Sequence, residues 1–200
     1  MNFLLRRYRF FTLVVLCGFL LSLSPYVSAA SFPPNVNLKI VRSTWLGWYN
    51  SVRVKAKLIP YVYHSTLHRT ATAWSQTALQ RGYIDHKREG HTTYYDYQMI
   101  KKWFVAQGVA FRGADTLFTE NIGWSPYVCD EKDCTKKMIA TIRPIFDAYV
   151  AEKGQSYSPH YDSIASSFFT KIGLGIAVDD VAGKLYLTVH YARKIPQVSL

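Results

Sequence analysis

The sequence Thr119-Glu120-Asn121-Ile122-Gly123-Trp124 sets a glutamate and an asparagine side by side in a run of otherwise apolar residues. Residues 117–124 predict a β-strand, and burial of that strand would take Glu120 with it. A carboxylate is costly to bury without a partner. One that is tolerated in such a place usually serves a cation, a histidine or a set of backbone donors. Glu120 is therefore a candidate site residue.

Two alternating runs near the C-terminus predict a β-hairpin. Apolar residues alternate with glycine or alanine over residues 172–178 and with polar or smaller residues over 185–191, with a turn between them. Earlier in the chain, apolar residues at helical spacing predict helices over residues 41–52, 67–78, 96–107 and 138–149. Helices first and antiparallel strands last indicate an α+β domain.

The first thirty residues predict an export signal. Three arginines precede an almost unbroken apolar run, Phe10 to Leu23, and small residues follow, so cleavage is expected after Ala29 or Ala30. An uncleaved anchor helix is the alternative, although the run is slightly too short to span a bilayer comfortably. The sequence thus predicts a signal peptide at 1–30, an extended lead-in at 31–41 and a folded domain at 42–200. Secretion to the extracellular space or the periplasm is the expected localisation.

Composition narrows the class of protein. Of the 200 residues, 49% are hydrophobic and 18% are charged, which excludes a disordered chain and a coiled coil. The net charge is +11 and becomes +8 once the predicted signal peptide, with three arginines and no acidic residue, is removed. This excess favours an anionic or amphipathic ligand, such as a lipid or a cell-envelope component. Because the charge is diffuse and no nucleic-acid-binding motif accompanies it, nucleic acid is not an expected partner, and after signal cleavage no membrane span is expected.

The mature chain keeps two cysteines, Cys129 and Cys134, in a polar stretch with four residues between them. Outside the cytosol such a close pair usually forms a local disulfide. A metal site would need two further soft ligands nearby, and the neighbouring side chains with ligand chemistry are acidic. We therefore predict a disulfide that closes a short loop.

Four segments carry a resemblance to a known family. They are Tyr49-Asn50-Ser51-Val52-Arg53, Leu67 to His86, Thr119-Glu120-Asn121-Ile122, and His160-Tyr161-Asp162-Ser163-Ile164 with the following Ile172-Gly173-Leu174-Gly175-Ile176-Ala177. Together they resemble the CAP superfamily of cysteine-rich secretory proteins, venom antigens and plant pathogenesis-related proteins, whose SCP-like extracellular domain has many exported bacterial members. The resemblance covers about residues 42–192. Each segment is a weak signal alone, but four in family order are specific.

The resemblance implies a three-layer α-β-α sandwich with a central antiparallel sheet and a cleft lined by two histidines and one or two acids. Carried over by position, the histidines are His86 and His160 and the acid is Glu120. Two neutral imidazoles with a carboxylate suit a divalent cation such as Zn²⁺, with water completing the coordination shell. The same three groups could instead activate water by general-base action.

The sequence departs from the family pattern at a few places. Thr119 replaces the usual glycine before the glutamate. His91 is a rival to His86 as the first histidine, and the preceding Gly82-Tyr83 favours His86. The second cleft acid has no clean match, and Asp147 is favoured over Glu152 or no acid at all. A structural role is expected for His190, in the last alternating run.

Two functions follow from the resemblance. The first is a secreted binding module for a lipid, a cell-envelope component or a protein, with a divalent metal held by His86, Glu120 and His160. The second is a hydrolase of peptide or cell-wall bonds, metal-assisted or driven by histidine and glutamate. Binding is favoured because Ser158 and Ser163 lie in no nucleophile motif and the predicted disulfide takes both mature cysteines.

Overall fold

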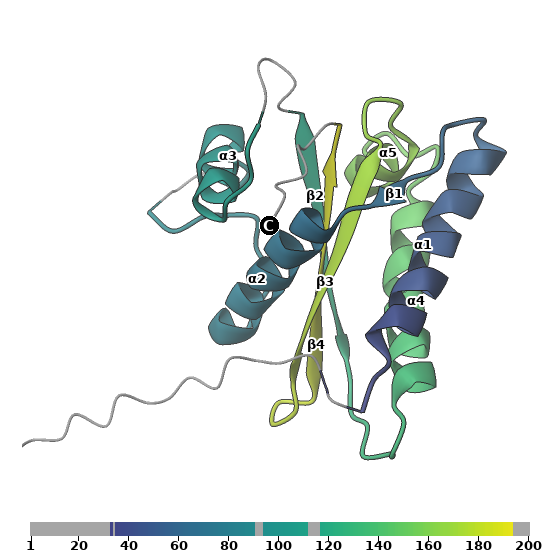
Figure 1. Cartoon of the computed structure of the whole chain (residues 1–200), viewed down its shortest axis with the longest axis vertical. Coiled ribbons are helices and arrows are strands. Elements are labelled where there is room, and N and C mark those ends of the chain that lie inside the picture. Colours follow the sequence, from purple (N-terminus) through teal and green to yellow (C-terminus); the bar gives the residue numbers. More distant parts are fainter. Residues whose placement is uncertain (1–32, 34, 91–93, 112–116, 194–200) are drawn as a thin grey trace, which may run out of the picture.

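The chain folds into a sheet that lies between two layers of helices (Figure 1). The computed structural model describes residues 33, 35–90, 94–111 and 117–193. In chain order the elements are α1 (Leu38–Lys55), β1 (Val62–Tyr63), α2 (Ser65–Arg81), α3 (Tyr97–Ala106), β2 (Phe118–Pro126), α4 (Thr135–Ala151), α5 (Pro159–Ala165), β3 (Lys171–Asp179) and β4 (Lys184–Ala192). Helices α1 and α4 cover one face of the sheet, and α2 covers the other face with α3 beside it. The predicted α+β sandwich is confirmed.

The sheet is mixed, whereas the resemblance implied an antiparallel one. Its strand order is β1-β3-β4-β2, and β4 pairs antiparallel with both β3 and β2. The short β1 instead runs parallel to β3, with Val62 opposite Lys171 and Tyr63 opposite Ile172. Two residues are too few to show an alternating pattern, so this edge strand could not be predicted from periodicity.

Helix α1 begins at Leu38, inside the segment predicted as an extended lead-in over 31–41. The Asn37 side chain accepts a hydrogen bond from the Ile40 amide at 3.2 Å and caps the helix. The apolar pattern starts only at Val41, which is why the predicted boundary was late. The preceding Asn35 accepts a bond from the Cys134 amide at 2.8 Å, so this segment is tied to the loop before α4.

The predicted disulfide between Cys129 and Cys134 is present. It closes the loop between β2 and α4, and the buried Cys134 is the residue immediately before the first turn of α4. The covalent bond thus fixes the start of this helix relative to the end of β2.

Helix α2 lies directly against the backbone of β3. A Cβ atom at Gly173 would come within 2.3 Å of the His68 backbone nitrogen, and one at Gly175 within 2.0 Å of the Ala71 carbonyl carbon. Only glycine permits so close an approach. These contacts fix the position of α2 on the sheet. The left-handed Gly82 (φ 78°) ends the helix, and the following loop starts from that fixed point.

Arg53 joins α1 to the segment after α5 from a buried position, with 1% of its surface exposed. Its guanidinium donates to four backbone carbonyls at 2.7 to 3.2 Å, those of Ile59, Ile164, Ser166 and Phe169. Ile164 belongs to the last turn of α5, and Ser166 and Phe169 belong to the segment between α5 and β3, which lines the cavity described below.

Replacing Arg53 by methionine is expected to lower the free energy of unfolding by about 3 kcal/mol or more, because four carbonyls lose their donor. Urea denaturation measures the loss. Lys55→Met on the same helix is the matched control, since Lys55 is exposed, and its effect is expected within about 0.5 kcal/mol. Equal losses of unfolding free energy in the two variants would show that the four hydrogen bonds of Arg53 do not stabilise the fold.

Candidate functional site

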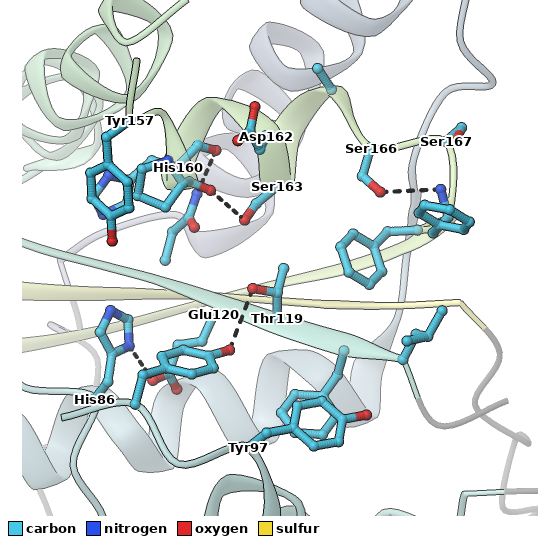
Figure 2. A pocket seen from close by; sticks show the side chains of 18 of the residues that line it. His86, Tyr97, Thr119, Glu120, Tyr157, His160, Asp162, Ser163, Ser166 and Ser167 are labelled. Atoms are coloured by element: carbon cyan, nitrogen blue, oxygen red, sulfur yellow. Dashed lines mark hydrogen bonds and ion pairs between the residues drawn. The ribbon is translucent and has the colours of Figure 1, made fainter. Parts of the chain in front are cut away.

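A cavity of about 1220 Å³ lies between the first residues of β2, the residues before α3 and the segment 157–169 that contains α5 (Figure 2). His86, Glu120 and His160, predicted from three distant segments of the sequence, all line it. Figure 2 shows His86 and Glu120 on one side of the cavity and His160 on the side of α5. The fold therefore brings the three predicted residues to one cavity.

Glu120 lies at the centre of a buried network that occupies both of its oxygen atoms. Oε1 accepts from His86 Nδ1 at 2.8 Å and from Arg88 Nη1 at 3.1 Å. Oε2 accepts from Arg88 Nη2 at 2.8 Å and from His190 Nε2 at 2.7 Å. Its side chain has 0% of its surface exposed. Both oxygens of Glu120 are consequently occupied and none is left to offer a metal in the cavity.

The electrostatics of this network keep Glu120 ionised. Burial raises the pKa of the Glu120 carboxyl, but the Arg88 guanidinium and the bonds from His190 and His86 outweigh it, and the pKa lies well below 4.5. An ionised carboxylate only accepts hydrogen bonds, so both histidines donate to it. His86 therefore carries a proton on Nδ1.

His190 is part of the site, although the sequence suggested only a structural role. Strand register places it opposite Glu120, on the adjacent strand β4. It is fully buried, which lowers its pKa, and its Nδ1 lies 2.9 Å from the Thr70 hydroxyl. A neutral ring that donates through Nε2 to Glu120 leaves Nδ1 as an acceptor, and the single Thr70 hydroxyl proton is shared between this nitrogen and the Leu67 carbonyl at 3.1 Å. The carboxylate is thus connected to α2 as well as to the cavity.

Arg88 is the second residue that the sequence analysis missed. Its guanidinium stacks 3.4 Å from the ring centre of Trp74 and 4.6 Å from that of Trp103, which belong to α2 and α3. Arg88 therefore connects both helices to Glu120 on β2. In the sequence it stands in a polar, glycine-containing stretch that predicted a loop, and nothing there indicates a buried cation.

His160 forms a separate pair with Glu152. Its Nδ1 is bonded to Glu152 Oε1, and the other carboxylate oxygen accepts from the backbone amides of His160 at 2.9 Å and Tyr161 at 3.1 Å. The ring stacks on Tyr149 with centres 4.6 Å apart. Asn121 Nδ2 donates to the His160 carbonyl at 3.1 Å, so the residue after Glu120 also fixes this histidine.

The structure corrects the preferred second acid. Asp147 forms an exposed pair with Arg143 on α4, at 2.8 Å, and does not line the cavity. Glu152, the alternative, is the acid beside His160, because α4 ends there and the chain turns back toward α5. Of the two candidates for the first histidine, His86 lies in the cavity wall, and His91 lies outside the described residues.

The arrangement fits a metal less fully than expected. Within the described ranges, no three His, Cys, Asp or Glu side chains are grouped so that they could hold an ion. What remains are two imidazoles whose Nδ1 atoms are bonded to carboxylates, a pairing that leaves Nε2 as the ligand atom. His86 and His160 could thus supply two ligands, with Glu120 and Glu152 as the residues that orient them.

The match with a family model identifies the class of protein. The model described as "CAP: Cysteine-rich secretory protein family" matches residues 46–191. This range contains both His–Glu pairs and the hairpin, as the resemblance over 42–192 predicted. The chain belongs to this family.

Solved structures with a similar fold come from several bacteria. They include an outer surface protein of Borrelia burgdorferi (TM-score 0.54, 13% identity, 80% of this chain and 96% of that chain). The CAP domain of enterococcal PrgA (TM-score 0.50, 16%, 76% and 60%) is also similar. So is an extracellular protein containing a SCP domain from Bacillus anthracis (TM-score 0.49, 17%, 82% and 45%), and the chain spans less than two thirds of these last two. At 13% and 16% identity, the likeness to the Borrelia and enterococcal structures shows the fold alone.

Comparison with curated protein sequences finds no match. Over the part of the chain that the structure describes, no helix combines the length and hydrophobicity needed to cross a bilayer.

Glu120→Gln is expected to lower the free energy of unfolding by about 3–5 kcal/mol near neutral pH, because Arg88 then lacks its buried counter-charge. The pKa of Glu120 is lowered in the folded state, so its contribution to stability is present above pH 4.5 and is lost as the pH falls through the lower, folded-state pKa. The variant should therefore lose less stability than the wild type on acidification below pH 4.5.

Urea denaturation across the acid range measures both effects. Asp147→Asn, which removes an exposed carboxylate, is the control and should change stability by less than about 1 kcal/mol. A Glu120→Gln variant as stable as this control would contradict the network described above.

Proposed function

We propose that this protein is an exported binding module whose cavity takes an amphipathic ligand, such as a lipid or another component of the cell envelope. The observation that carries the proposal is the division of the cavity wall into an aromatic part and a polar part. The aromatic part is formed by Tyr94, Tyr95, Tyr97, Phe118, Tyr157, Phe168 and Phe169. The polar part contains His86, His160 and Asn121.

The aromatic part is open to a ligand. Tyr94, Tyr157 and Phe168 line the cavity, yet 64%, 79% and 60% of their surfaces are exposed. Large apolar side chains gathered at a hollow and left uncovered are typical of ligand-binding sites. An apolar chain placed against them would remove this surface from water, which is favourable by about 25 cal/mol per Å².

The polar part suits a head group. The imidazoles of His86 and His160 each have Nδ1 occupied by a carboxylate, which leaves Nε2 as the atom for contact with a ligand. The net charge of +8 that remains without the predicted signal peptide favours a ligand with an anionic head. Export is supported by the N-terminal sequence and by the Cys129–Cys134 disulfide, a bond that persists in oxidising compartments.

Phe168→Ser is expected to weaken binding of a fluorescent polyene fatty acid about tenfold, because one exposed ring of the aromatic part is lost. Fluorescence titration of the purified protein gives the dissociation constant. Val181→Ser, at a fully exposed residue in the β3–β4 turn, is the control and should leave affinity unchanged. A wild-type protein that binds neither the fatty acid nor the alcohol of equal chain length would refute the proposal.

A divalent cation at the two imidazoles is a second element of the proposal. His86 and His160 would hold the ion through Nε2, and water or the ligand would complete its shell. A bound Zn²⁺ would supply a positive charge for an anionic head group. Glu120 and Glu152 would orient the rings by accepting from Nδ1.

Zinc titration by calorimetry tests this element. Heat of binding is expected for the wild type, and His86→Gln and His160→Gln should each weaken the affinity about tenfold or more. His68→Gln, a partly buried histidine on α2 outside the cavity wall, is the control. Absence of heat with the wild type would remove the cation from the proposal and leave the ligand cavity in place.

Hydrolysis is the second candidate function, and the two His–carboxylate pairs at one cavity favour it. A ring that donates through Nδ1 to a carboxylate can accept a proton from water at Nε2. Two lining serines are engaged with backbone groups and not with a histidine: Ser163 donates to the Pro159 carbonyl, and Ser166 accepts from the Phe168 amide. Turnover of a peptide or cell-wall substrate that disappears in His160→Gln would favour hydrolysis over binding alone.

A further inference from the structure

Arg88 lies two residues after His86, between α2 and α3, and is 4% exposed. We propose that Arg88 is a positioning residue: through Glu120 it holds the His86 ring with the proton on Nδ1 and with Nε2 facing the cavity. The proposal rests on the proposed function only in taking His86 as a residue that contacts whatever the cavity binds.

The first step is the saturation of the Glu120 carboxylate. An ionised carboxylate has about four acceptor positions, and four donors from three residues fill them here. Arg88 supplies two of these donors, one to each oxygen, in the fork geometry that guanidinium and carboxylate share. This bidentate pair fixes the rotation of the carboxylate about its last bond. One direction is then left for the His86 Nδ1–H group.

The second step is that Arg88 also holds His86 directly. Its Nη1 donates to the His86 carbonyl at 2.9 Å as well as to Glu120 Oε1 at 3.1 Å. A single guanidinium nitrogen therefore joins the backbone of His86 to the oxygen atom that accepts from its ring. His190 makes no comparable double contact with His86 and its acceptor, because it bonds to Oε2 of Glu120 and not to Oε1.

The third step is that Arg88 itself is immobilised. The guanidinium contacts the rings of both Trp74 and Trp103, at 3.4 and 4.6 Å from their centres, and these two rings meet edge-on with centres 5.4 Å apart. Planar stacking and a bidentate pair are properties of arginine that lysine lacks. Contacts with α2 and α3 thus fix the position of Arg88. Its hydrogen bonds to Glu120 and to the His86 carbonyl in turn fix the position of His86.

Among the described residues, the other contacts of the His86 ring are with aromatic rings. Tyr94 and Tyr95 meet it edge-on, with ring centres 5.3 and 5.2 Å away. They restrict the tilt of the ring, but no hydrogen bond from them selects which nitrogen is protonated. Figure 2 shows the nitrogen of His86 that is not bonded to Glu120 pointing into the cavity. The choice of tautomer therefore comes from the Arg88–Glu120 pair.

The test is a long-range ¹H–¹⁵N NMR measurement of the His86 ring in the purified protein, well above the ordinary histidine pKa of about 6.5. The signal is assigned by its loss in His86→Gln. The wild type is expected to show one form, protonated on Nδ1. In Arg88→Lys and Arg88→Met the single form should be lost, with both ring-nitrogen shifts moving toward the average of the two tautomers.

Arg81 provides a matched control. It lies 5.0 Å from the ring centre of Trp74 and donates to the Lys87 carbonyl, but has no contact with Glu120. Arg81→Lys and Arg81→Met should leave the His86 signals unchanged. Unchanged signals in folded Arg88 variants, or equal changes in the Arg81 variants, would overturn the proposal.

Two further outcomes separate this proposal from the proposed function. A wild-type His86 that is protonated on Nε2, or that averages between forms, overturns the role of Arg88 even if every Arg88 variant fails to fold. A protein that binds no fatty acid or zinc but keeps the Nδ1–H form of His86 and loses it in Arg88→Lys would refute the proposed function and support this one.

Discussion

The burial of one charged carboxylate is the constraint on which the rest of the structure depends. The Glu120 side chain has no exposed surface, and an ionised group in such a place is stable only when its partners are fixed around it. The loop after α2 supplies two partners, His86 and Arg88, and β4 supplies the third, His190. The cavity lies where these elements must meet, so the same bonds that make the carboxylate tolerable also place an imidazole in the cavity wall.

This meeting requires that α2 lie very close to the sheet. Gly173 and Gly175 let the helix touch the backbone of β3, which brings Thr70 within reach of His190 and starts the following loop near β2. A Cβ atom at either glycine would come within 2.3 Å of backbone atoms of α2, so the helix would have to move outward. The partners of the carboxylate would then move with the helix, so the glycines and the charged network form one geometric unit.

The sequence was informative where the pattern is local or the residue type is unusual. The strand around Glu120, the hairpin and the disulfide could be predicted because alternation, turn residues and cysteine spacing are visible in short windows. Arg88 and His190 could not, since their roles depend on strand register and on how two helices meet around a guanidinium. Asp147 was preferred to Glu152 because residue spacing alone does not show where α4 ends. The end of this helix decides which acid lies beside His160.

Helix α4 joins two features that were described separately. The disulfide-bonded Cys134 precedes its first residue and Glu152 follows its last, so about 25 Å of helix separate the two. Reduction of the disulfide would affect the loop before α4, at the end of the helix that is far from the cavity. It could reach His160 only by shifting the whole helix, which stays packed on the sheet by its own apolar face. The disulfide and the cavity thus lie at opposite ends of the same helix.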